Sequence, residues 1–181
     1  MLLSRTSQLS TLDPPAPHSS LPAPPNPSRS HLPPLGLSAA RTFIDAFLWN
    51  TVDAVLVLRF GLADDPACMQ LDDVLARAAA DVSGFARAAL VDVRAAGVAA
   101  YVACLDVQVV PACVFFFNAT HIKMDSGTPD HGKWVGPFTC KQDYIDVVET
   151  IFRGAMRGKL IVTCPLPRDR IPHYDLLYQG F

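Results

Sequence analysis

The sequence predicts an α/β fold, a three-layer sandwich in which helices cover both faces of a mixed β-sheet. After position 37, short and strongly apolar runs alternate with segments of helical periodicity. The apolar runs are rich in Val, Leu and Phe, as strands buried on both faces are. Of the 181 residues, 50% are hydrophobic and 18% are charged, which suffices for a packed core and excludes disorder along the whole chain.

Residues 1–37 differ in composition from the rest of the chain. They hold nine of the 16 prolines, and the first aromatic residue is Phe43. Such a segment buries too little surface to offset the entropy that it would lose on ordering. We therefore expect residues 1–37 to form a disordered, partly polyproline-like tail and residues 38–181 to form one domain.

Charge and hydropathy exclude two classes of role. The net charge is −2, whereas proteins that bind nucleic acid by neutralising phosphates normally carry a basic excess. We therefore expect no direct binding of nucleic acid. No apolar run approaches the roughly 18 residues of a membrane span, so we expect no membrane contact.

The five cysteines and five histidines form no motif of known chemistry. No two cysteines are separated by two residues, which excludes a dithiol redox pair and a zinc-ribbon knuckle. The histidines have no partner at the spacing of metal ligands. We expect the cysteines to act as small hydrophobic residues in a reducing compartment, and we expect neither a metal nor another cofactor.

The first half of the domain begins with a helix, a strand and a second helix. Residues 43–49 have the spacing of a short amphipathic helix, and residues 54–60 form an almost continuous apolar run typical of a buried strand. Asp65 followed by Pro66 is a strong helix start, and the helix should end near residues 83–84. One stripe of this helix is apolar: Cys68, Leu71, Leu75 and Ala78.

The next elements alternate in the same way. Residues 88–93 predict a second buried strand, and residues 97–105 predict a weaker helix. Residues 112–117 predict a third strand, joined by a tight Asn-Ala turn to an antiparallel partner over residues 120–124. Residues 125–138 are rich in Gly and Pro and are expected to form a loop.

Residues 139–158 carry the clearest helical pattern in the chain. Thr139 and Gln142 have the spacing of a capping box. A short strand over residues 160–163 follows, and residues 165–181 extend the domain at its C-terminus. The apolar stripe of the helix is continuous: Tyr144, Ile145, Val148, Ile151, Phe152 and Ala155.

This order of elements is that of thioredoxins, whose reactive cysteine begins the helix after the first central strand. Here Asp65 occupies the position of the nucleophile, and only the resolving position keeps its cysteine, Cys68. A carboxylate cannot attack a disulfide, so Asp65 is interpreted as the helix cap and Cys68 as a packed cysteine. Asp64 and Asp65 should disfavour the Cys68 thiolate, and Asp72-Asp73 is interpreted as a solvated helix face.

Pro111 is the second landmark of the thioredoxin comparison. Thioredoxin-like folds have a cis-proline just before the third central strand, and Val110-Pro111 precedes the predicted strand over residues 112–117. We therefore predict a cis bond here rather than an ordinary trans proline at a strand start. Together, Asp65, Pro66, Cys68 and Pro111 form a degenerate thioredoxin site.

Several segments resemble the thioredoxin-like pre-mRNA splicing factors, the DIM family. The resemblance covers residues 32–181, and residues 153–162 and the C-terminal block carry its most specific features. The matching segments are Val55–Gly61, Asp65–Asp73, Val114–Asn118, Pro129–Lys133, Lys141–Asp143, Arg153–Val162 and Ile171–Gln179. The tail before Leu32 has no counterpart in the family pattern.

The resemblance implies a nuclear protein of the spliceosome that associates with the tri-snRNP and works by protein contacts. It further implies binding to the helical-repeat pre-mRNA-processing factor six, homodimerisation and a link to cell-cycle progression. Three hypotheses stand at this point: a non-catalytic splicing scaffold, a single-cysteine thiol redox protein that uses Cys68, and a degenerate copy without function.

Charge is distributed unevenly along the domain and suggests a docking face. Residues 64–106 hold seven Asp against three Arg, whereas residues 153–170 hold five basic residues against one Asp. Opposite potentials steer association, and aromatic residues beside Arg are typical of interfaces. The alternative is a solvated helix end with a tail that caps the core. The candidate partner-binding residues are Arg153, Arg157, Lys159, Tyr174 and Tyr178.

Overall fold

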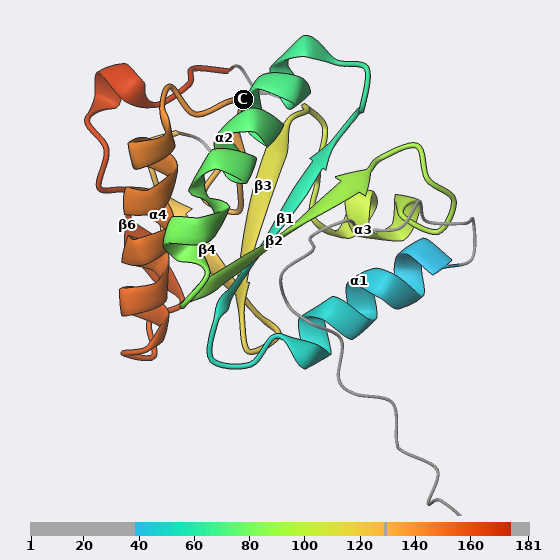
Figure 1. Cartoon of the computed structure of the whole chain (residues 1–181), viewed down its shortest axis with the longest axis horizontal. Coiled ribbons are helices and arrows are strands. Elements are labelled where there is room, and N and C mark those ends of the chain that lie inside the picture. The colour runs from blue at the N-terminus through green and yellow to red at the C-terminus, as the bar shows by residue number, and fades with distance from the viewer. Residues whose placement is uncertain (1–38, 129, 175–181) are drawn as a thin grey trace, which may run out of the picture. The chain divides into compact units, whose positions relative to one another are not determined.

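A mixed β-sheet forms the centre of the fold in the computed structural model, which describes residues 39–128 and 130–174 (Figure 1). The predicted tail, residues 1–37, lies outside the described residues. Within the described residues the strand order is β2-β1-β3-β4-β6, and β5 pairs with β3. The strands are β1 Val55–Gly61, β2 Ala86–Asp92, β3 Ala112–Phe117, β4 Thr120–Asp125, β5 Trp134–Val135 and β6 Ile161–Thr163.

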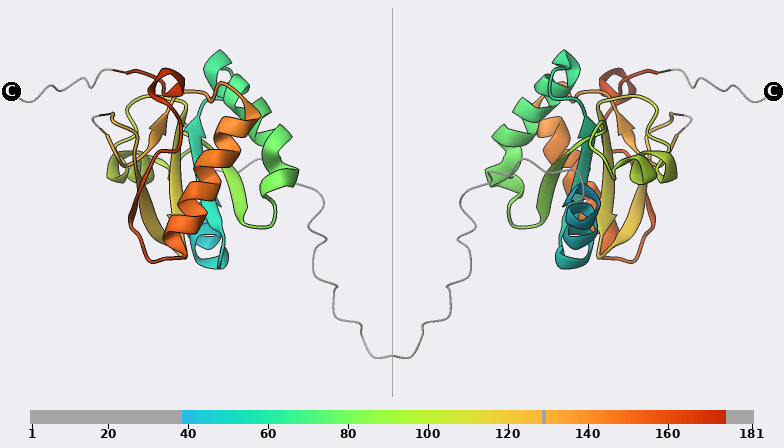
Figure 2. Two further views of the ribbon diagram at one scale, coloured as in Figure 1. Left: turned by 90° about the vertical axis from the view of Figure 1, so that its left-hand side faces the viewer. Right: turned by 90° about the vertical axis from the view of Figure 1, so that its right-hand side faces the viewer.

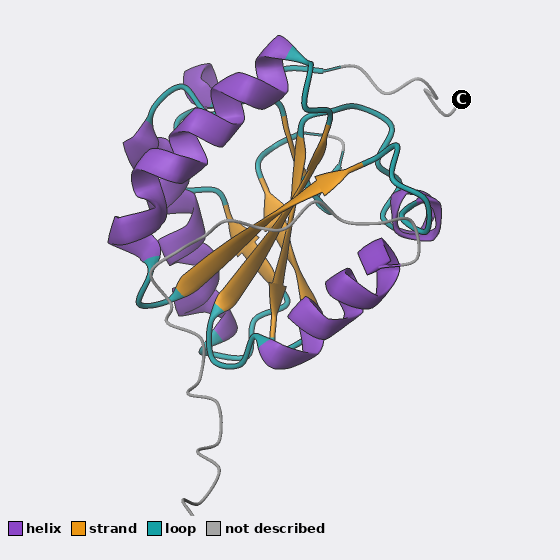
Figure 3. Ribbon diagram, turned by 45° about the vertical axis from the view of Figure 1, so that its right-hand side comes forward, coloured by secondary structure: helices purple, strands orange, loops and turns teal. Residues whose placement is uncertain are grey.

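Helices cover both faces of the sheet, as Figure 3 shows. Helices α2 and α4 pack against each other on one face, and α1 and α3 lie on the other (Figure 2). The helical elements are α1 Ala39–Asn50, α2 Pro66–Val82, α3 Ala99–Cys104, α4 Lys141–Ala155 and the 3₁₀ turn η1 Arg168–Arg170. The predicted three-layer sandwich is confirmed.

The central strand β1 separates two hydrophobic cores. Every residue of β1 is buried, because successive side chains point to opposite faces and both faces are covered. Val55 and Val57 pack in the core under α2 and α4, whereas Leu56, Leu58 and Phe60 pack in the core on the opposite face. The apolar run in the sequence therefore supplies both cores at once.

The hairpin between β3 and β4 is also as predicted. Phe117 pairs with Thr120, and the intervening Asn118 and Ala119 have φ angles of 48° and 59°. Two consecutive residues with positive φ give the tight turn that matches the twist of antiparallel strands. Asn118 suits this conformation, and its side-chain oxygen also accepts the backbone N–H of Asp53 at 2.7 Å.

The structure corrects two predictions about strands. The segment expected to be a second buried strand is β2, which lies at an edge of the sheet and exposes Leu90 and other alternate residues. The segment expected to be a loop over residues 125–138 contains β5, which pairs antiparallel with Ala112 and Cys113. Two residues are too few to show a strand pattern in the sequence.

The predicted capping box at the start of α4 is wrong. The N-cap is Cys140, whose side chain makes no capping hydrogen bond, and Gln142 donates instead to Asp146 at 2.7 Å. The residue at the third helical position is Asp143, which is buried and accepts a hydrogen bond from Arg170 at 2.8 Å. This long-range pair holds the first turn of α4 and replaces the local motif.

No helix of the described part is long and apolar enough to cross a membrane.

Helix α4 approaches β6 closely, and Gly154 permits this approach. A Cβ atom at Gly154 would overlap the Val162 side chain, whose β-branched carbon has little freedom to move. The contact places β6 beside the last turns of α4.

We predict that Gly154→Ala destabilises the domain although alanine is the better helix former. The gain in helix propensity is about 1 kcal/mol, and overpacking of a tight contact costs about 1–3 kcal/mol. Chemical denaturation should show a lower free energy of unfolding. Gly84→Ala is the control, since a Cβ atom there meets no neighbouring atom. A Gly154→Ala variant at least as stable as the wild type would contradict the packing argument.

Candidate functional site

Asp65 lies between β1 and α2 in the chain and caps that helix. Its backbone is extended, and its carboxylate accepts the Cys68 N–H at 2.8 Å. Pro66 fills the first helical position, where the missing N–H costs nothing. The hydrogen bond lowers the pKa of Asp65, so the carboxylate is ionised at neutral pH. The predicted N-cap is confirmed.

Cys68 is fully buried in the first turn of α2. Its Sγ accepts the Leu62 N–H at 3.3 Å, an interaction that favours the thiolate. Burial outweighs this hydrogen bond and raises the pKa of Cys68, and the nearby Asp65 carboxylate raises it further. The thiol therefore stays protonated at neutral pH, which agrees with the prediction of a packed cysteine.

Gly61 allows the strand and the helix to approach at this point. A Cβ atom at Gly61 would lie 2.6 Å from the Cys68 Sγ and would also overlap the Arg59 guanidinium. No side chain larger than hydrogen fits there without moving one of these groups. The absence of a side chain at Gly61 thus keeps Cys68 sealed against β1.

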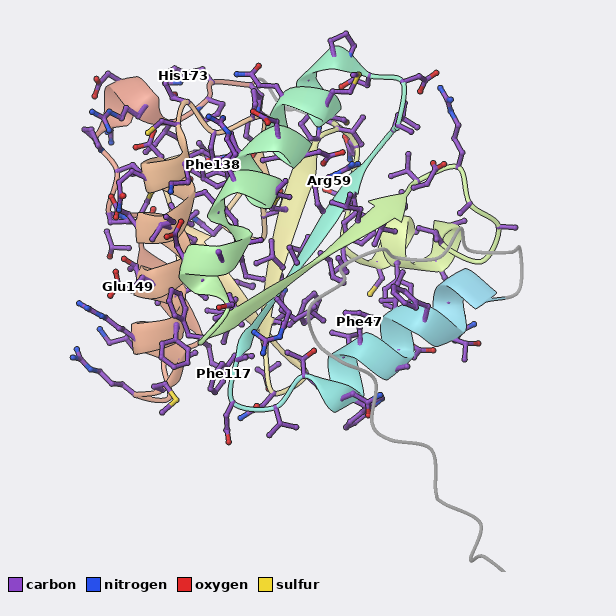
Figure 4. The ribbon with its side chains drawn as sticks, viewed as in Figure 1. Phe47, Arg59, Phe117, Phe138, Glu149 and His173 are labelled. Carbon is purple, nitrogen blue, oxygen red and sulfur yellow. The ribbon has the colours of Figure 1, made fainter. Side chains whose placement is uncertain are left out.

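An ion pair between a buried arginine and a partly buried aspartate lies beside this junction and was missed from the sequence. Arg59 lies on β1, is 4% exposed (labelled in Figure 4) and pairs with the Asp72 carboxylate of α2. The interpretation of Asp72-Asp73 as a solvated face is therefore wrong for Asp72, although Asp73 is exposed and pairs with Arg77. A cation within a buried strand was the available signal, since a buried charge requires a partner.

Pro111 precedes β3 and follows a cis peptide bond, as predicted. The proline is buried, and Cys113 follows it in the fully buried part of β3. Burial raises the pKa of Cys113 to about 12. All five cysteines are free thiols, and the pKa is raised by burial at Cys164 as well as at Cys68 and Cys113.

The degenerate site therefore lacks the groups that thiol exchange requires. Exchange needs a thiolate at an accessible and electropositive position. Here the first position is a capping carboxylate, and the remaining cysteine is buried and protonated. Across residues 39–128 and 130–174, no three His, Cys, Asp or Glu side chains gather in a cluster that could hold a metal ion.

Three of the candidate partner-binding residues come together. Arg153, Arg157 and Lys159 line a hollow of about 370 Å³ between the last turns of α4 and strand β6. We call it the α4–β6 hollow. Its other lining residues are Thr150, Gly154, Ile161, Val162 and Thr163.

The structure separates Tyr174 from these cations. Tyr174 is partly buried against the core on the α1 and α3 face of the sheet. Its neighbour His173 lies near the start of α4 (Figure 4), whereas the hollow lies near the end of that helix. Tyr178 lies outside the described residues. The five candidates therefore do not form one continuous surface among the residues that are described.

We predict that Asp65→Ala lowers the melting temperature at pH 7 by about 2–4 °C, because it removes an N-cap. Asp65→Asn is the matched control, since asparagine caps equally well and carries no charge. The carboxylate pKa is lowered on folding, so its stabilisation is present above the ordinary value of 3.8 and is lost as the pH falls through the folded value. The difference between wild type and Asp65→Ala should therefore shrink in acid. Equal melting temperatures at pH 7 would contradict the cap.

Comparison with known proteins places this geometry in a family. The family model described as "Mitosis protein DIM1" matches residues 37–168. The chain is 52% identical over 136 residues to "Thioredoxin-like protein 4B" of Homo sapiens, covering 75% of this chain and 90% of that protein. It is 31% identical over 122 residues to "Spliceosomal protein DIB1" of Saccharomyces cerevisiae, covering 67% of this chain and 84% of that protein.

A solved structure supports the fold independently. Chloroplastic thioredoxin z matches with a TM-score of 0.50 and 18% sequence identity, over 68% of this chain and all of that one. The thioredoxin-like fold expected from the order of elements is therefore confirmed. The family model spans most of the chain, and the relatives match along most of their own length, so this chain belongs to the mitosis protein DIM1 family.

Proposed function

We propose that this protein is a non-catalytic thioredoxin-fold scaffold in pre-mRNA splicing, with a link to cell-cycle progression. Relatives named as a spliceosomal protein and a mitosis protein support this role. One observation carries the non-catalytic part: Asp65 caps α2 where a thioredoxin has its nucleophile, and Cys68 behind it is buried and protonated.

The packing of the site supports binding rather than turnover. In a thioredoxin the start of this helix must present a sulfur atom to substrate. Here Gly61 and the Arg59 guanidinium lie close to Cys68, Asp72 pairs with Arg59, and the helix start is held by its own cap. The fold therefore retains its framework while the former reaction centre is part of the core, which leaves the outer surface for protein contacts.

We further propose that the partners are spliceosomal proteins in the nucleus, among them the helical-repeat pre-mRNA-processing factor six, and that the protein also forms homodimers. Arg153, Arg157 and Lys159 are proposed to contribute to docking, because they gather at one hollow on the surface. Tyr174 and Tyr178 are proposed as contributors from the C-terminal segment.

The docking proposal is tested by recovery of partners from nuclear extract with tagged, full-length protein. Arg157→Glu combined with Lys159→Glu should recover spliceosomal proteins at about a tenth of the wild-type level, which corresponds to a loss of about 1.4 kcal/mol in binding free energy. Arg41→Glu with Arg77→Glu is the matched control, since it reverses two exposed charges elsewhere. Normal recovery by the first variant, shown to be folded, would exclude the hollow as the docking surface.

The alternative of a single-cysteine redox protein has one supporting contact, the Leu62 N–H that Cys68 Sγ accepts. It predicts reduction of insulin or exchange with glutathione that is lost in Cys68→Ser. The scaffold proposal predicts turnover no higher than that of Cys68→Ser, with an active thioredoxin as the positive control. Cys68-dependent turnover would overturn the non-catalytic proposal.

A further inference from the structure

We propose that the α4–β6 hollow and the outer edge of β6 bind an acidic, extended segment of a partner protein, which adds to the sheet as a further strand. The inference rests on the proposed function and deepens it, because it assigns the chemistry of the segment that docks. It stands on three features of the described residues: a free strand edge, unpaired cations beside it, and exposed apolar side chains.

Strand β6 presents a free edge. It is the last strand of the sheet and pairs on one side with β4 in parallel. On that side Leu160 O accepts the Lys123 N–H at 2.8 Å, and Cys164 N–H donates to Asp125 O at 2.7 Å. Alternate residues of a strand bond to opposite sides, so the N–H and C=O groups of Ile161 and Thr163 point to the outer edge. No strand among the described residues pairs there.

The hollow beside this edge is cationic. Arg153, Arg157 and Lys159 line it, and no acidic residue does. Arg153 is held by Glu149 on α4 at 2.5 Å. Within the described part of the chain, no carboxylate lies within the 4.0 Å of an ion pair from Arg157 or Lys159. These two cations are therefore free to pair with carboxylates of an incoming segment.

Exposed apolar side chains lie in β6, just before it, and at the end of α4. Met156, Leu160 and Ile161 are 59%, 62% and 50% exposed. Edge strands are protected from aggregation by shortness and by charged side chains, neither of which requires large exposed apolar groups. Large apolar groups interspersed with cations are instead typical of a surface that a partner covers. An alternating segment of acidic and apolar residues matches both parts of this surface, since its side chains alternate along a strand.

The same features favour protein over RNA as the occupant. Single-stranded nucleic acid binds to aromatic stacking platforms beside cations, and no aromatic residue lines the hollow. The chain has a net charge of −2, which weakens binding driven by phosphate neutralisation. Backbone N–H and C=O groups at a free edge, by contrast, are the groups that an added strand uses.

The test uses full-length protein and a fluorescein-labelled synthetic peptide of about six alternating Asp and Val residues, the length of a typical strand. Three matched probes accompany it: the same peptide with alternate backbone nitrogens methylated, a Lys-Val peptide of equal length, and a single-stranded RNA. Fluorescence anisotropy at low salt measures binding to the wild type, to the Arg157→Glu and Lys159→Glu double variant, and to the Arg41→Glu and Arg77→Glu control.

We expect the Asp-Val peptide to bind the wild type and the control equally. The double variant should bind the peptide with an affinity at least about tenfold lower, because the charge pairing is lost. The methylated peptide should also bind about tenfold more weakly, because it cannot form the ladder. Hydrogen exchange at the amides of Ile161 and Thr163 should slow in the complex, while exchange in β2, at the opposite edge of the sheet, stays unchanged.

Several results would overturn the inference. Equal affinity for the methylated peptide, or protection of β2 instead of β6, would exclude strand addition. Tighter binding of RNA than of the peptide would show that the partner is a nucleic acid. If hydrogen exchange in β6 slows without peptide as the protein concentration rises and a dimer forms, the occupant is a second copy of the chain. If the Asp-Val peptide does not bind but partner recovery still depends on Arg157 and Lys159, strand addition fails and the scaffold function stands. If the peptide does not bind and the wild-type protein recovers no spliceosomal partner, both strand addition and the scaffold function are excluded.

Discussion

The hydrogen bond from the Cys68 N–H to the Asp65 carboxylate is the interaction on which the geometry of this site depends. It satisfies the start of α2 with a side chain from the chain itself, at the point where a thioredoxin exposes its reactive sulfur. The ionised carboxylate then adds to the effect of burial and keeps the neighbouring thiol protonated. One residue thus stabilises the helix and suppresses thiol chemistry at the same position.

The packing behind this bond is consistent with a closed site. Gly61 lets β1 and α2 meet without a gap, and Arg59 pairs with Asp72 across the same junction. The Arg59 Nε and Asp72 Oδ1 atoms are buried without a hydrogen-bond partner in the described residues, so the pair is not fully satisfied. Removal of Asp72 would leave the buried Arg59 charge unpaired, which costs more than the pair itself contributes. The junction is therefore stabilised from β1, through Arg59, and from α2, through Asp72.

The parts of the fold that were predicted from sequence have strong local signals. The apolar run of β1, the Asp-Pro start of α2 and the Asn-Ala turn each depend on neighbouring residues alone. The failures depend on contacts that are distant in sequence: β5 pairs with β3, and the first turn of α4, which begins at Lys141, has Asp143 bonded to Arg170 in place of a local capping box. The same limit applies to the surface, where Arg153 and Lys159 line one hollow but Tyr174 packs elsewhere.

The protonation state of Cys68 can be measured by the rate of alkylation of each cysteine as a function of pH, resolved by mass spectrometry of the peptides. Cys104 is exposed and serves as the internal reference. Burial and the Asp65 carboxylate raise the pKa of Cys68, so it should react far more slowly than Cys104 at pH 7 and equally fast after denaturation. Rapid alkylation of Cys68 in the folded protein at pH 7 would show a reactive thiolate and contradict the account.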